Sequence, residues 1–138
     1  MTNYYLIGLG SNIEANTNIS RAHSAIAQHV EIIELSPVLI NPPCGKTFHF
    51  PFHNQILLIR SPKNCVQLKA IFENIEIQLG REAKCAERKF NDRPIDIDIL
   101  QQQQDLQRLL KQPLVEPYNQ QIMSNWKLKS SHSENTDH

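Results

Sequence analysis

Apolar residues along the chain fall into short blocks whose spacing changes between the strand period and the helix period. Residues 4–9 are apolar and aromatic and stop at Gly10, which predicts a buried strand followed by a turn. Over residues 19–30 the apolar positions recur three and four apart, and that spacing predicts a helix. The Asn-Thr-Asn stretch at 16–18 precedes it and offers N-cap side chains.

The middle of the chain predicts two further strands and a second helix. Residues 31–40 have the apolar content of a strand, but Pro37 must then lie at an edge or a bulge because it has no N–H to donate. Residues 52–60 predict the next strand. The clearest helix covers 65–79, where the apolar residues form one stripe, and Gly80 stands where the helix should end.

The last clear element is residues 95–100, where Ile and Asp alternate with the period of a half-buried strand. The predicted order is strand, helix, strand, strand, helix, strand. This is the split βαβ order of a ferredoxin-like α+β fold, an antiparallel sheet with helices on one face. Residues 106–118 stay ambiguous. We expect one domain over 1–128 and a polar, flexible tail over 129–138.

Composition narrows the class of protein. Lysine and arginine balance aspartate and glutamate at 14 each in 138 residues, which gives no general electrostatic reason to expect a nucleic-acid or membrane partner. Cys44, Cys65 and Cys85 are odd in number and lack metal-ligand spacing, so we expect free thiols in a reducing compartment. No leader-like segment or run of ~20 apolar residues is present. The expected location is cytoplasmic.

Candidate chemistry concentrates at Asp96 and Asp98. Side chains two apart on a strand project from the same face, so these two carboxylates should lie together with the isoleucines on the other face. Adjacent like charges repel unless a cation lies between them. A divalent cation with oxygen ligands, such as Mg2+, fits this pair. The alternative is an acidic strand that simply faces solvent.

A basic segment directly precedes the carboxylate pair. Cations beside a metal-binding pair suit phosphoryl transfer, because they neutralise charge that develops on the phosphates. The alternative is a solvated, charged loop. The chain has no GxxxxGK[ST] phosphate loop, so a bound nucleotide would be held by metals and by cations. The basic residues are Arg81, Lys84, Arg88, Lys89 and Arg93.

Five ordered blocks resemble the 6-hydroxymethyl-7,8-dihydropterin pyrophosphokinase family over residues 4–100. Each block is weak alone, and the shared order and spacing make the set specific. The blocks are Leu9-Gly10-Ser11-Asn12, Pro42-Pro43 with Gly45, Phe52-x-Asn54, Glu76-x-x-Leu79-Gly80-Arg81, and Arg93-Pro94-Ile95-Asp96-Ile97-Asp98-Ile99-Leu100.

The resemblance implies a ferredoxin-like enzyme that transfers pyrophosphate from ATP to the hydroxymethyl group of the pterin and releases AMP. By similarity, Asp96 and Asp98 would hold two Mg2+ ions with ATP. Phe52 would stack on the pterin, and Asn54 would hydrogen-bond its edge. ATP and the pterin are the expected partners of a monomer. The other residues implied are Arg81, Arg88 and Arg93 for the phosphates, and the backbone around Pro43, Cys44 and Gly45 for the pterin. The family block assigns no role to Glu76.

The resemblance decays after Leu100. Family members carry a Pro-His pair, then an arginine and an aromatic, whereas this chain has Pro117-Tyr118 and no arginine over 114–126. Trp126 would replace the second stacking aromatic, or it is a packed tryptophan. Two hypotheses therefore stay open: a pyrophosphokinase of reduced rate, or a weakened paralogue that binds a pterin or a nucleotide without turnover. They differ in whether Tyr118, Lys127 or Lys129 folds back over the phosphates.

Overall fold

A single antiparallel sheet organises the part of the chain that the computed structural model describes, residues 2–41, 51–82 and 94–127. The strand order is β2-β4-β1-β5, and the short β3 also pairs with β4. The predicted α+β fold with an antiparallel sheet is confirmed. The strands are β1 (Asn3–Ser11), β2 (Glu31–Leu35), β3 (Leu39–Asn41), β4 (Phe52–Ser61) and β5 (Asp96–Gln103). The expected tail over 129–138 lies outside the described residues.

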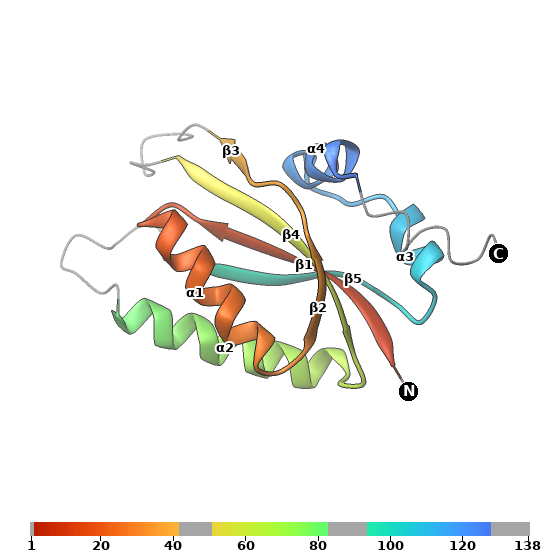
Figure 1. Cartoon of the computed structure of the whole chain (residues 1–138), viewed down its shortest axis with the longest axis horizontal. Helices are drawn as coiled ribbons and strands as arrows, with labels where there is room; N and C mark the ends of the chain where they lie inside the picture. Colours follow the sequence, from red (N-terminus) through yellow and green to blue (C-terminus); the bar gives the residue numbers. More distant parts are fainter. Residues whose placement is uncertain (1, 42–50, 83–93, 128–138) are drawn as a thin grey trace.

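Helices pack on both faces of this sheet. The two predicted helices, α1 (Ala15–Ala27) and α2 (Cys65–Glu82), lie side by side on one face, as expected (Figure 1). The segment that the sequence left ambiguous forms α3 (Leu106–Lys111) and the start of α4 (Pro117–Asn125). Both pack on the opposite face, α3 against β1 and β5 and α4 against β4. No described helix is long and apolar enough to cross a membrane.

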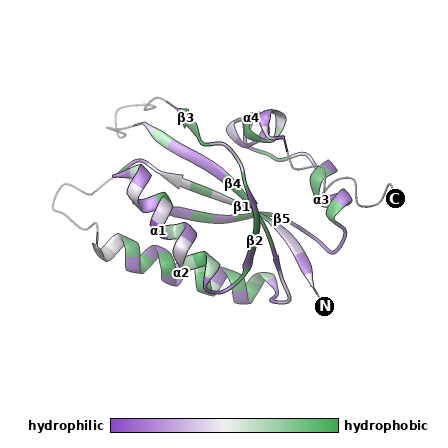
Figure 2. Cartoon of the chain, in the orientation of Figure 1, coloured by the Kyte–Doolittle hydropathy of each residue, from purple (hydrophilic) through white to green (hydrophobic). Residues whose placement is uncertain are grey.

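Alternating residues of the strands supply two apolar clusters, one on each face. Between the sheet and α1 and α2, the buried cluster includes Tyr5, Leu57, Phe72 and Ile97. On the other face, Leu6, Ile56 and Leu58 pack with residues of α3, of α4 and of the chain around them. Figure 2 shows hydrophilic and hydrophobic positions alternating along α1 and α2, as expected for helices with one buried face.

The strand predicted over 31–40 is interrupted between β2 and β3. Ser36 holds the interruption in place, because its N–H donates to the Ile56 carbonyl at 2.9 Å and its hydroxyl accepts from the Ile56 N–H at 2.8 Å. Pro37 follows it without an N–H to satisfy. The prediction that Pro37 lies at an edge is confirmed, since β2 is the outer strand of the sheet.

The predicted bounds of the first helix and the predicted end of the second were wrong by a few residues. Helix α1 begins before the Asn-Thr-Asn stretch, with Glu14 at the N-cap in a left-handed conformation (φ 42°). Asn18 is buried, and its side-chain amide donates to the Ile13 carbonyl at 2.6 Å. Helix α2 continues through Gly80 to Glu82. Gly80 meets no obstacle there, because an added Cβ would have nothing within 4 Å.

The stability of the α2 face can be tested with two truncations on one helix. Leu68 is fully buried, whereas Val66, two residues earlier, is 78% exposed. Leu68→Ala should lower the free energy of unfolding by about 3 kcal/mol, because it removes buried methyl groups and leaves a cavity. Val66→Ala should change it by less than about 0.5 kcal/mol. Urea unfolding measures both, and equal losses would contradict this packing.

Candidate active site

The carboxylates of β5 lie on the face of the sheet that α1 and α2 do not cover. Asp96 pairs with Gly10 of β1, and Asp98 pairs with Gly8. Ile97 between them is buried in the cluster with α2, so the predicted alternation is confirmed. Asp96 is half-buried and Asp98 is exposed. Both carboxylates therefore stand on one face, within reach of a ligand from solvent.

Gly8 and Gly10 carry no side chains beside these carboxylates, and the side chains of neighbouring strands come close to both positions. A Cβ added at Gly10 would lie 3.1 Å from Asn54 Oδ1 and 3.9 Å from the Asp96 Cβ. At Gly8, an added Cβ would approach the Leu100 side chain to 3.2 Å. Asn54 and Asp96 thus flank Gly10, and the absence of a side chain at Gly10 lets the Asn54 amide come close to the backbone there.

Asn54 completes a row across three strands. It pairs with Gly10, which pairs in turn with Asp96, and two strand spacings put the outer Cα atoms roughly 10 Å apart. Asn54 is only 8% exposed. Phe52, two residues earlier on β4, shares the face of Asn54 and is half-buried. The structure thus brings Phe52 and Asn54 to the same face as the carboxylate pair.

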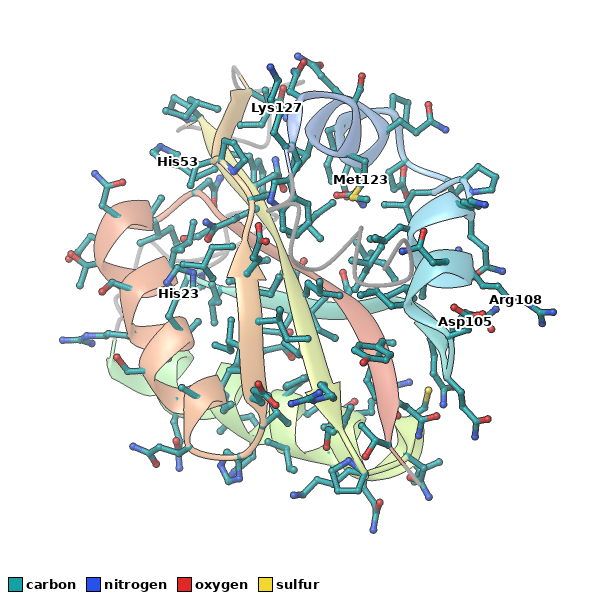
Figure 3. All side chains as sticks on the ribbon, turned by 45° about the vertical axis from the view of Figure 1, so that its right-hand side comes forward. His23, His53, Asp105, Arg108, Met123 and Lys127 are labelled. Carbon is teal, nitrogen blue, oxygen red and sulfur yellow. The ribbon has the colours of Figure 1, made fainter. Side chains whose placement is uncertain are left out.

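His53 belongs to the opposite face of β4, as the alternation predicted (Figure 3). Gln55, two residues further along β4, lies on the same face as His53. Its Oε1 is 2.7 Å from His23 Nε2 of α1. The Gln55 amide also donates to the Ser36 carbonyl at 2.6 Å. These bonds tie α1 and the interruption after β2 to the strand that carries Asn54.

Some of the predicted site residues lie outside the described part of the chain. They are Pro43, Cys44, Gly45, Arg88, Arg93 and the side chain of Arg81. Their roles stay predictions.

The charged residues of α3 lie apart from the sheet. Arg108 and Asp105 project outward from α3 (Figure 3), and Asp105 caps this helix by accepting the Gln107 N–H at 2.9 Å. We therefore assign Arg108 no role at the site. The predicted phosphate-binding arginines are those of the segment before β5.

The C-terminal segment contributes one packed aromatic residue and one near the carboxylates. Trp126 is 8% exposed and belongs to the apolar cluster under α3 and α4, so its proposed stacking role stays a prediction. Tyr118, at the start of α4, is 38% exposed. Burial raises the pKa of Tyr118, and the carboxylates of Glu116, Asp98 and Asp96 raise it further. A protonated phenol therefore lies within electrostatic range of the carboxylate pair.

Lys127, which follows α4, is exposed (Figure 3). Lys129 lies outside the described residues. The effect of Asp98 and Asp96 on the pKa of Tyr118 favours the hypothesis that Tyr118 faces the site.

Glu76 is the residue that the sequence analysis left without a role. Its Oε2 accepts a hydrogen bond from the Ile97 N–H at 2.7 Å. Burial raises the pKa of Glu76 against the effect of that hydrogen bond, and the carboxylates of Asp96, Asp98 and Glu73 raise it further. In the sequence, Glu76 is a charged residue directly beside the core position Ile75.

The donor set fits a magnesium ion bound together with a phosphate. Within the described ranges, no group of three or more His, Cys, Asp and Glu side chains is arranged to hold a metal. Asp96 and Asp98 would therefore need further oxygen ligands from a nucleotide and from water. Magnesium is bound in this way in many phosphate-using sites, through one or two protein carboxylates.

The pKa of Glu76 predicts a pH-dependent effect on stability. A folded pKa above the ordinary 4.5 means that the folded state binds more protons than the unfolded state, so stability is lost as pH rises through the folded pKa. Without divalent cations, Glu76→Gln should raise Tm at pH 7, and the gain should vanish below about pH 4.5. Glu73→Gln, the same change at an exposed position of α2, is the control. A pH-independent difference would contradict this cause.

Known proteins resemble this chain over most of its length. Residues 6–129 match the family model of 7,8-dihydro-6-hydroxymethylpterin-pyrophosphokinase (HPPK). The 2-amino-4-hydroxy-6-hydroxymethyldihydropteridine pyrophosphokinase of Helicobacter pylori is 32% identical over 108 residues, which cover 72% of this chain and 62% of the relative. The protein of that name from Porphyromonas gingivalis is 33% identical over 96 residues, 68% of this chain and 65% of the relative. The chain thus spans less than two thirds of these relatives. It belongs to the 7,8-dihydro-6-hydroxymethylpterin-pyrophosphokinase family.

Proposed function

We propose that this chain transfers a pyrophosphoryl group from ATP to 6-hydroxymethyl-7,8-dihydropterin, a step of folate biosynthesis. The observation that carries the proposal is the row Asn54–Gly10–Asp96 across β4, β1 and β5. It puts the residue proposed to hold the pterin edge and a carboxylate proposed to hold the metal on either side of Gly10. Family membership supplies the pair of substrates.

The reaction needs two substrates held in line. The hydroxymethyl oxygen attacks the β-phosphorus of ATP, and the bond from that phosphorus to the oxygen bridging to the α-phosphorus breaks. The products are the pterin diphosphate and AMP, and the hydroxyl proton leaves to water. In a loose transition state the main requirements are position and charge stabilisation, rather than a strong base.

Each site residue has one proposed task. Asp96 and Asp98 would hold two Mg2+ ions, and these would supply positive charge that neutralises the phosphates. Phe52 stacks on the pterin, and the Asn54 amide hydrogen-bonds its edge. Tyr118, a protonated phenol near the pair, donates a hydrogen bond on the side where family members carry histidine. The remaining residues are proposed for the phosphates (Arg81, Arg88, Arg93), for the pterin through the backbone (Pro43, Cys44, Gly45) and for stacking (Trp126).

The cellular setting is part of the same proposal. We propose a cytoplasmic monomer whose domain covers residues 1–128. A formal net charge of zero supports small-molecule partners rather than a nucleic acid.

The first test is release of AMP from ATP and Mg2+, with and without 6-hydroxymethyl-7,8-dihydropterin. Asp96→Asn and Asp98→Asn should each lower the pterin-dependent rate at least about 100-fold, because each removes a charged ligand of the reacting phosphates. Asp105→Asn is the matched control, since this exposed N-cap residue lies on α3 and asparagine also caps helices. It should retain the wild-type rate.

The opposite result has a clear meaning. If folded wild-type protein releases no more AMP than the Asp96→Asn, Asp98→Asn double variant, the enzyme proposal is wrong. The alternative is then a binding module, and titration with the pterin and with ATP would identify its ligand.

The close approach of Asn54 to Gly10 gives a second prediction. Gly10→Ala should push the Asn54 amide away, because the added Cβ would lie 3.1 Å from Asn54 Oδ1. The pterin Kd should rise about fivefold, the cost of roughly one weakened hydrogen bond. Gly8→Ala meets the Leu100 side chain instead and should leave the pterin Kd within about twofold. Calorimetric titration measures both, and equal weakening by the two variants would contradict the role of Asn54.

A further inference from the structure

β5 lies at the edge of the described sheet, and Glu76 fills a gap in its hydrogen bonding. One side of β5 pairs with β1, and no described strand pairs with its other side. Backbone N–H groups on such an edge need a partner other than a strand. The Ile97 N–H finds one in Glu76 Oε2 at 2.7 Å. The acceptor comes from α2, 21 residues earlier in the chain.

The bonded N–H belongs to the residue between the two carboxylates. The backbone dihedral angles of Ile97 determine how the side chains of Asp96 and Asp98 are directed relative to each other. On one side this backbone is held by the register with Gly10 and Gly8. On the other side it is held by Glu76.

The anchor itself is rigid. Glu76 follows Ile75 on α2, and the buried residues Phe72, Ile75 and Leu79 fix that part of the helix against the sheet. A carboxylate acceptor also gives a stronger hydrogen bond than a neutral one. The effect of Asp96 and Asp98 on the pKa of Glu76 places its carboxylate within electrostatic range of both.

We propose that Glu76 is a positioning residue for the metal site. By accepting the Ile97 N–H, it holds Asp96 and Asp98 in the geometry that binds the divalent cation of the nucleotide. Glu76 itself is not a ligand, in keeping with the lack of a three-residue metal group in the described residues. The inference rests on the proposed function for the identity of that cation.

The test separates the hydrogen bond from the charge and from the fold. Glu76→Met and Glu76→Ala remove the acceptor, and Met keeps most of the volume. Glu76→Gln keeps an acceptor oxygen and removes the charge. Glu73→Ala is the matched control, an exposed carboxylate one turn earlier on α2.

Two measurements are made on each variant, and neither requires turnover. The first is amide hydrogen exchange of Ile97 by NMR, without metal. The second is Mn2+ affinity in the presence of ATP, by electron paramagnetic resonance. Loss of the acceptor should speed Ile97 exchange and weaken Mn2+ binding, each about tenfold, the value of one hydrogen bond. Glu76→Gln should stay within about threefold, and Glu73→Ala should match the wild type.

Three results would overturn the proposal. Faster Ile97 exchange in Glu76→Met and Glu76→Ala with unchanged Mn2+ affinity would show a purely structural bond. Equal loss of Mn2+ affinity in Glu76→Gln and Glu76→Met would show that charge, not the hydrogen bond, acts on the metal. Absence of Mn2+ binding by folded wild-type protein with ATP would remove the site itself.

The AMP assay tests the proposed enzyme activity separately from the positioning role of Glu76. If wild-type protein releases no AMP while Mn2+ affinity follows the predicted order, the enzyme proposal fails and the positioning role stands. If AMP is released, Glu76→Met should raise the Mg2+ concentration for half-maximal rate more than it lowers kcat at saturating Mg2+. In Glu76→Gln, the Mg2+ concentration for half-maximal rate should return toward the wild-type value.

Discussion

Burial of Ile95 and Ile97 against α2 is the constraint on which the site depends. The side-chain period of a strand is two, so a shift of β5 by one residue would turn both carboxylates toward the helices. Such a shift would bury two charges in an apolar cluster and expose the isoleucines, which is strongly unfavourable. Packing of the isoleucines on one face of the sheet therefore determines that the two carboxylates project from the other face.

The face of the sheet opposite α1 and α2 is divided along the strands into two parts. Toward α3 and α4, Leu6, Ile56 and Leu58 continue an apolar cluster that includes Trp126. Toward the other end of the same strands, the sheet presents Gly8, Gly10 and Asn54 instead. Strands β1 and β4 thus both pack against the C-terminal segment and carry residues of the site. The carboxylates of Asp98 and Asp96 raise the pKa of Tyr118, which lies on α4.

Local sequence patterns predicted the parts of the structure that local physics controls. The Ile/Asp alternation of β5 gave the direction of Asp96 and Asp98, and the apolar stripe of α2 gave its buried face. The start of α1 was missed because the buried Asn18 bonds back to the Ile13 carbonyl instead of capping the helix from outside. The contact of Glu76 was missed for a related reason. Its partner is a backbone N–H on a distant strand, and no side-chain pattern encodes that pairing.

The interruption after β2 also affects how this protein behaves in concentrated solution. The outer edge of the sheet carries exposed Leu35, Val38 and Ile40, a combination that could pair with the edge of another molecule and start aggregation. Ser36 and Pro37 divide this edge into strands of five and three residues. Each piece is too short, and the break between them too irregular, to template a long intermolecular ladder. The bend that shapes the fold thereby also protects the chain against self-assembly.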